Sequence, residues 1–97
     1  MNVYWSDNAE EQLDTIYEYL AQYSEKTALE TVDRITQSSI QISSFPLSGR
    51  EVPEYTIKQI REIIEAPYRI IYYIKPDSIE ILAVIHGSQN LESIPKQ

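Results

Sequence analysis

Three side chains that could carry chemistry, Arg61, Arg69 and His86, fall at the starts or ends of predicted strands. Functional groups are often placed where a strand meets a loop, whereas strand interiors mostly pack. Arg69 could bind a phosphate or a carboxylate, since a guanidinium forms paired hydrogen bonds with either. His86 could act as a general acid or base, because an unperturbed imidazole titrates near neutral pH. These residues are therefore the candidates for a catalytic site.

An internal ion pair explains Arg69 equally well. The residue lies in an apolar stretch between Tyr68 and Ile70. An arginine there loses hydration and needs an anionic partner. Glu62 or Glu65, on the preceding predicted strand, could be that partner instead of a ligand.

Arg61 and His86 also have plain structural explanations. Arg61 could be a solvated or salt-bridged strand residue, and His86 could close the last strand before Gly87. Whether Arg61 faces the same side of the sheet as Arg69 depends on the loop between their strands. A shift of one residue in that loop inverts the facing, so the sequence leaves this question open.

The composition excludes several kinds of site. The chain of 97 residues has no cysteine and one histidine, which rules out disulfides and thiol nucleophiles and supplies too few favoured ligands for a metal. Its two glycines do not form a phosphate-binding loop. We therefore expect no metal and no cofactor.

The charge is negative and unevenly distributed. Residues 1–49 carry eight acids against two bases, a net charge of −6, and residues 50–97 carry seven acids against six bases. Such a surface repels the phosphate backbone and attracts a basic partner segment, although most of the acids can be explained as keeping the domain soluble. Strong direct binding of nucleic acid is not expected.

No apolar run is long enough for a membrane helix, and the first residues lack the pattern of a signal peptide, so a cytoplasmic location is expected.

The first half of the chain predicts a short strand and two helices. Residues 3–5 alternate as in a strand, and the spacing of Asp7 and Glu10 resembles a capping box. Ser24 is a plausible cap for the second helix, and the short turn before it requires the two helices to run antiparallel. The apolar stripes are formed by Ala9, Leu13, Ile16 and Leu20 in the first helix, and by Ala28, Val32, Ile35, Ser39 and Ile42, widened by Leu29, in the second.

The second half predicts three strands. Residues 60–65 and 68–75 are separated by Ala66-Pro67, and residues 79–85 follow a second turn. In the last strand, alternation places Ile79, Ile81, Ala83 and Ile85 on one face. The whole chain is expected to be one α+β domain with the order βααβββ, in which a helical hairpin packs on a mostly antiparallel four-stranded sheet.

These segments together resemble the ParE/RelE toxin superfamily of type II toxin–antitoxin systems. The resemblance covers nearly the whole chain, and it is closest to the ParE-like branch, often labelled plasmid stabilisation proteins. It is carried in order by the segments VYWSDNAEEQLDTIYEYLA, FPLSGREVPE, REI, PYRIIYYI and IEILAVIHG.

The resemblance implies one of two activities. RelE-like members cut mRNA on the ribosome, and Arg61, Arg69 and His86 match positions that serve this reaction. However, Gly87 stands where an aromatic residue would help, and residues 88–90 are not rich in arginine. ParE-like members instead inhibit DNA gyrase by protein contact without being enzymes, which the acidic chain fits better. A remnant that only binds its antitoxin is a third possibility.

The resemblance also implies a cognate antitoxin, ParD-like or related. Its basic C-terminal segment would be disordered alone and would fold on the toxin, with a helix in the groove of the helical hairpin. The segment could also add a strand at the sheet edge. The residues expected to contact it are Leu13, Ile16, Tyr17, Leu20, Arg69 and Tyr73.

Overall fold

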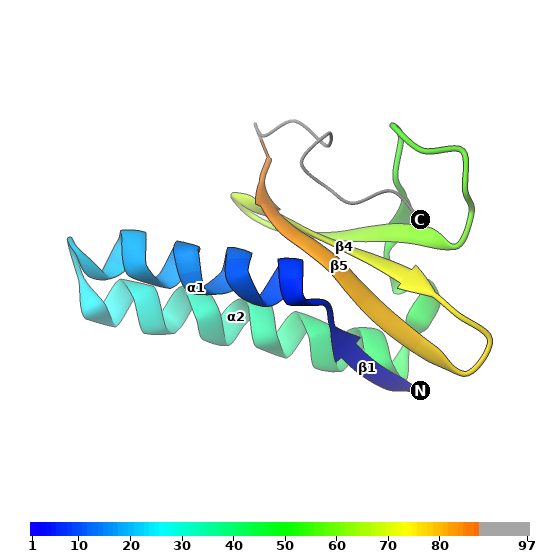
Figure 1. Ribbon diagram of the computed structural model, residues 1–97, viewed down its shortest axis with the longest axis horizontal. Helices are drawn as coiled ribbons and strands as arrows, with labels where there is room; N and C mark the ends of the chain where they lie inside the picture. The colour runs from blue at the N-terminus through cyan, green and yellow to red at the C-terminus, as the bar shows by residue number, and fades with distance from the viewer. Residues whose placement is uncertain (88–97) are drawn as a thin grey trace.

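A computed structural model describes residues 1–87 of the chain (Figure 1). The predicted order of a strand, two helices and a sheet is confirmed. The elements are β1 (Asn2–Trp5), α1 (Asp7–Ala21), α2 (Glu25–Ser44), a short 3₁₀ turn η1 (Pro46–Ser48), β2 (Arg50–Glu51), β3 (Ile60–Glu65), β4 (Tyr68–Ile74) and β5 (Ser78–His86). In the described part of the chain, neither helix is long and apolar enough to cross a membrane.

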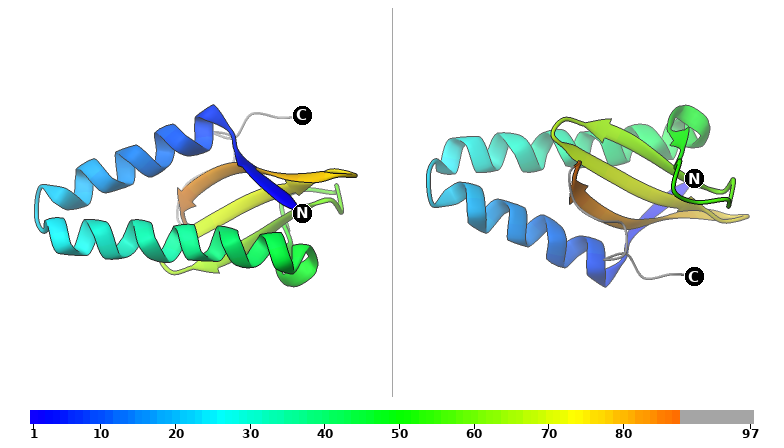
Figure 2. Two further views of the ribbon diagram at one scale, coloured as in Figure 1. Left: turned by 90° about the horizontal axis from the view of Figure 1, so that it is seen from below. Right: turned by 90° about the horizontal axis from the view of Figure 1, so that it is seen from above.

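Both helices begin at a serine cap. The Oγ of Ser6 accepts a hydrogen bond from the backbone N–H of Ala9, and that of Ser24 accepts one from Thr27. Each cap satisfies one of the N–H groups that a helix leaves unpaired at its start. The prediction of Ser24 as the cap of α2 is confirmed. The cap of α1 is Ser6 and not Asp7, which begins the helix. The helices meet at the turn formed by residues 22–24, run antiparallel, and splay apart toward the sheet, with β1 passing between them (Figure 2).

The sheet has five strands in the order β1-β5-β4-β3-β2, so the prediction of four strands is wrong. β1 runs parallel to β5, and every other pair is antiparallel. The additional strand is β2, in which Arg50 and Glu51 pair with Glu62 and Arg61. Pro53, which lacks a backbone donor, lies beyond the two residues that pair.

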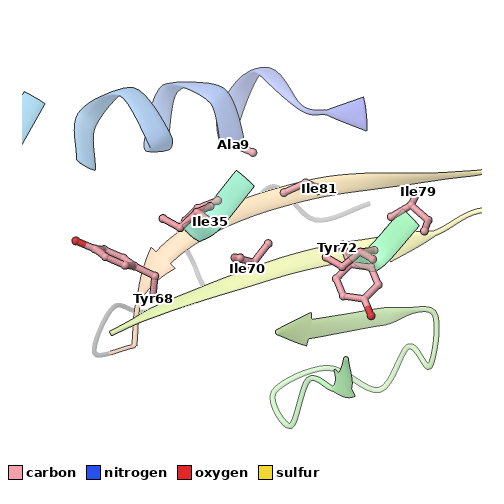
Figure 3. Packing of buried hydrophobic residues seen from close by; sticks show 9 residues of the cluster. Ala9, Ile35, Tyr68, Ile70, Tyr72, Ile79 and Ile81 are labelled. Atoms are coloured by element: carbon pink, nitrogen blue, oxygen red, sulfur yellow. The ribbon is translucent and has the colours of Figure 1, made fainter. Parts of the chain in front are cut away.

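The main core lies between the helices and one face of the sheet, here called the helix face. Ala9 and Ile35 from the helices meet Ile70, Tyr72 and Ile79 from the sheet, all with no exposed surface (Figure 3). Burying each large side chain of this kind contributes about 1.5–3 kcal/mol. The predicted stripes are thus confirmed at these positions, and Leu13 and Ile16 pack against the same cluster. Leu29, however, is exposed and does not widen the stripe of α2.

A second apolar cluster lies on the opposite side of the sheet, here called the outer face. It contains Ile60, Ile71 and Ile85, and the segment between β2 and β3 adds Val52 and Tyr55. This arrangement explains why β4 is apolar on both faces, as expected for a strand that is covered on both sides. The segment between β2 and β3 therefore covers part of the outer face of the sheet.

A β-bulge in β5 changes which residues share a face. Ile81 pairs with Tyr72 while Ala83 pairs with Ile71, so Leu82 is the extra residue. The backbone there bonds to α1, because Leu82 O accepts from Asn8 Nδ2 and Val84 N–H donates to the side chain of Gln12. Simple alternation fails across such a bulge. The prediction that Ile79, Ile81, Ala83 and Ile85 share a face is therefore wrong, since Ala83 and Ile85 lie on the outer face.

Candidate functional site

Arg69 lies on the outer face and is held by two glutamates. Its Nε donates to Glu62 Oε1 at 2.6 Å, and its two terminal nitrogens donate to the two carboxylate oxygens of Glu54 at 3.0 and 3.1 Å. Arg69 is only 8% exposed, so these charge-assisted bonds replace much of the water it has lost. Of the two glutamates that the sequence offers as partners of Arg69, Glu62 binds it and Glu65 does not.

Strand facing explains this choice. Glu62 and Arg69 both lie on the outer face, whereas Glu65 lies opposite Tyr68 on the helix face. There Glu65 accepts hydrogen bonds from Arg34 at 3.3 Å and from Ser38 at 3.0 Å. The ion pairs of the two glutamates are therefore on opposite sides of the sheet.

Glu62 is the centre of a network that crosses three strands. Its side chain has no exposed surface, and its Oε2 accepts a bond of 2.6 Å from Arg50 Nε on β2 while Oε1 serves Arg69 on β4. Glu54 completes the network from the β2–β3 segment, with 47% of its side chain exposed. The hydrogen bonds from Arg69 lower the pKa of Glu54, and the bond to Glu54 is the main cause that raises the pKa of Arg69. Two guanidinium groups and two carboxylates thus neutralise one another.

An open pocket of about 340 Å³ adjoins this network. Arg50, Glu54 and Arg69 line it together with the hairpin residues Ala66, Pro67 and Tyr68 and with Pro53, Ile64 and Gly87. Glu54 accepts from both terminal nitrogens of Arg69, and Glu62 accepts from Nε, so no two adjacent N–H donors of this guanidinium are free. A phosphate or carboxylate entering this pocket would therefore have to displace one of the two glutamates to form paired hydrogen bonds with Arg69.

Arg61 lies on the helix face and stabilises the loop after α2. It is opposite Tyr72 in the sheet, and its Nη1 donates to Gly49 O at 2.8 Å, while its Nε is buried without a hydrogen-bond partner among residues 1–87. The hydroxyl of Tyr72 donates to Pro46 O at 2.6 Å and accepts from Gly49 N–H at 3.0 Å. Burial raises the pKa of Tyr72. Arg61 and Tyr72 together fasten residues 46–49 to the sheet.

His86 is exposed at the end of β5, opposite Tyr68. The two rings meet edge to face, with centroids 5.9 Å apart. Tyr68 and Tyr72 lie at opposite ends of the helix-face cluster (Figure 3), so His86 and Arg61 are at opposite ends of β4. With Arg69 on the outer face, the three candidate residues do not converge on one point.

The residues expected to contact a partner are also divided between the two faces. Leu13 and Ile16 pack against the helix-face core, and Tyr17 and Leu20 are half-buried on α1. Tyr73 packs against the outer-face cluster, on the same side as Arg69. A second groove, of about 300 Å³, is lined by Trp5, Glu10, Leu13, Asp14 and Thr36. In the described residues, no three histidines or acids are grouped so that they could hold a metal ion.

A family model described as "ParE toxin of type II toxin-antitoxin system, parDE" matches residues 3–91. The chain belongs to the ParE toxin family. Two solved structures share its fold. The chromosomal ParDE toxin–antitoxin system from P. aeruginosa gives a TM-score of 0.73 at 24% identity, covering 89% of this chain and 95% of that one. The YoeB dimer from Staphylococcus aureus gives 0.57 at 22% identity, covering 86% and 92%. A search of curated proteins found no match.

The sequence did not indicate several residues that surround Arg69 and Arg61 in this ParE-family toxin. Glu54 and Arg50 belong to the Arg69 network, but neither lies in a strand that the sequence predicts. The signal for Glu54 was weak, since it is one of several acids near Pro53. Gly49 shows no local signal in the sequence, because its role depends on the approach of Tyr72 from a distant strand.

Proposed function

We propose that this ParE-family toxin inhibits DNA gyrase by protein–protein contact and is neutralised by a cognate antitoxin. The observation that favours contact over catalysis is the internal pairing of Arg69 with Glu62 and Glu54. The most buried cation of the candidate nuclease set is already neutralised by carboxylates of its own chain. Gyrase as the target is the activity that the ParE-like resemblance implies, and a toxin with this target would act in the cytoplasm.

The alternative, a ribosome-dependent ribonuclease, has less support. RNA cleavage by this route needs cations and a proton-transfer group around one phosphate. Arg69 lies on the outer face, while Arg61 and His86 are at opposite ends of β4 on the other side. The net charge of −7 further opposes close approach to RNA.

The antitoxin part of the proposal is supported by family membership and by charge. Type II systems pair a toxin with an antitoxin, and the net charge of −6 on residues 1–49 favours a basic partner segment. We expect this partner to be ParD-like or related. It would fold against the helical hairpin and the sheet, and thereby cover the toxin's contact surface.

A supercoiling assay tests the gyrase proposal. Purified toxin is added to gyrase and relaxed plasmid, with and without an equimolar amount of antitoxin. We expect supercoiling to fall with toxin and to recover with antitoxin, and unchanged supercoiling at large toxin excess would reject gyrase as the target. Primer extension on translating mRNA, run in parallel, would detect the ribonuclease alternative. If induced expression of the toxin alone fails to arrest growth, the chain is a remnant that only binds its antitoxin.

A further inference from the structure

The groove lined by Trp5, Glu10, Leu13, Asp14 and Thr36 has walls of two different kinds. Its lining residues come from β1, α1 and α2. Figure 2 shows that the two helices splay apart toward the sheet and that β1 passes between them. Trp5 and Leu13 are half-buried and form an apolar part, while Glu10 and Asp14 are exposed and form an acidic part. A ligand that fits both parts must be apolar along its length and positively charged at its end.

The two carboxylates lack a counter-ion in the described chain. Glu10 and Asp14 are four residues apart on α1, so they lie on one side of the helix, where like charges repel. Neither forms an ion pair or a side-chain hydrogen bond with residues 1–87. Glu10 lies in the first turn of α1, where the helix dipole favours an acid. Asp14 lies beyond that turn, so the dipole does not account for it.

The cations of the helical half of the chain are placed elsewhere. Arg34 pairs with Glu65 at 3.3 Å on β3, and Lys26 lies in the first turn of α2, close to the tip of the hairpin. Neither residue lines the groove. A cation brought by another molecule would therefore relieve the repulsion between Glu10 and Asp14 without displacing an existing partner.

Trp5 adds a second reason to expect a long cationic side chain. It is half-buried and lines the groove together with Leu13. Lysine and arginine bury their aliphatic stems on apolar surface and keep the charged end near carboxylates. Tryptophan also attracts cations better than the other aromatic residues. A purely apolar anchor would leave both carboxylates uncompensated.

We propose that this groove binds a lysine or arginine side chain from the toxin-binding segment of the antitoxin, with its stem on Trp5 and Leu13 and its charge between Glu10 and Asp14. This inference depends on the proposed antitoxin partner and adds to it one defined contact. It makes Glu10 and Asp14 determinants of partner choice, because an antitoxin without a cation at this position would leave them unpaired.

The test compares two double variants with the same change in net charge. The groove variant is E10Q/D14N. The control is E11Q/E18Q, which removes two exposed acids of α1 that do not line the groove. The probe is the polypeptide encoded beside the toxin gene, immobilised on a sensor surface, with the toxin in solution at two salt concentrations. Thermal unfolding of each variant verifies its fold.

We expect the groove variant to bind at least about tenfold more weakly than the wild type and with less salt dependence, and the control to change by less than about threefold. Equal effects of the two variants would show a general charge effect and would overturn the inference. So would wild-type affinity of the groove variant. If the immobilised polypeptide fails to bind even the wild-type toxin, the antitoxin proposal itself fails, and that outcome is distinct from the other two.

A double-mutant cycle identifies the side chain in the groove. Each lysine or arginine of the antitoxin segment is replaced by methionine, which keeps the apolar stem and removes the charge. One of these replacements should weaken binding to the wild-type toxin but have little effect on binding to the groove variant. Additive effects for every basic residue would contradict the proposed contact.

Discussion

Both carboxylate oxygens of Glu54 accept hydrogen bonds from the terminal nitrogens of Arg69, at 3.0 and 3.1 Å. Glu54 comes from the irregular segment between β2 and β3, and Arg69 comes from the central strand β4. The pair therefore fastens a loop to the outer face of the sheet. Glu54 also occupies the edge of the guanidinium formed by its two terminal nitrogens, which is one of the edges that could form paired hydrogen bonds with a phosphate. This occupied edge connects the fold of the toxin to the proposed absence of RNA chemistry.

Replacing Glu62 should destabilise the toxin strongly. The Glu62 side chain has no exposed surface and bonds to both Arg50 and Arg69 at 2.6 Å. In Glu62→Ala the mostly buried Arg69 keeps only Glu54, so we expect the free energy of unfolding to fall by about 3 kcal/mol. Urea denaturation measures this loss. Glu51→Ala, on the exposed strand β2, is the matched control and should change the free energy of unfolding by less than about 0.5 kcal/mol; similar losses in the two variants would contradict the network.

The contribution of Glu54 should depend on pH. Arg69 lowers the pKa of Glu54 in the folded state below its usual value of 4.5. A carboxyl group with a depressed pKa adds stability above its unfolded pKa, and this stability is lost as the pH falls through the folded value. The wild type should therefore exceed Glu54→Gln in stability at neutral pH, and this advantage should decline as the pH falls below about 4.5. Urea denaturation from about pH 7 to about pH 3 measures the difference. A constant difference would show that the Glu54 charge does not act through Arg69.

The two helices and the order of the elements along the chain, apart from β2, could be predicted because local patterns determine them. Ala9, Leu13 and Ile16 recur at helical spacing, and Ser24 supplies a cap whose geometry is local. Local patterns do not determine whether Arg61 and Arg69 face the same side of the sheet. This facing depends on the two-residue turn Ala66-Pro67, which pairs Glu65 with Tyr68 and puts the two arginines on opposite faces.

The remaining errors come from interactions between distant parts of the chain. The bulge at Leu82 is bonded to Ser6 and Asn8, which lie more than seventy residues earlier. The pairing of β2 and the ion pair of Glu54 likewise require β3 and β4 to be in place. The spacing of residues within one segment carries no signal for such contacts. Contacts of this kind, however, form much of the network around Arg69 on the outer face.

Gly49 is expected to tolerate no larger residue. A Cβ at this position would lie 2.5 Å from the Tyr72 hydroxyl and 2.6 Å from Glu62 O. The hydroxyl cannot move freely, since it bonds to both Pro46 and Gly49. Gly49→Ala should therefore lower the free energy of unfolding by about 1–3 kcal/mol. The control is Gly87→Ala, where the nearest atom would be Pro67 O at 3.3 Å. In thermal unfolding, Gly87→Ala should have a stability close to that of the wild type. An equal loss of stability in Gly49→Ala and Gly87→Ala would contradict the role of the Tyr72 contact.

His86 offers the sharpest test between contact and catalysis. It is exposed at the end of β5 and lies on the face opposite Arg69. If the toxin acts by contact, His86→Ala should arrest growth and inhibit supercoiling as the wild type does. A ribonuclease that used His86 as a general acid or base would lose about 10²–10⁴-fold in rate. Ile79→Asp, which places a charge in the core, serves as the control that abolishes toxicity by unfolding. Loss of growth arrest in His86→Ala, with a thermal transition like that of the wild type and with mRNA cleavage by the wild-type toxin alone, would replace the gyrase proposal by the ribonuclease.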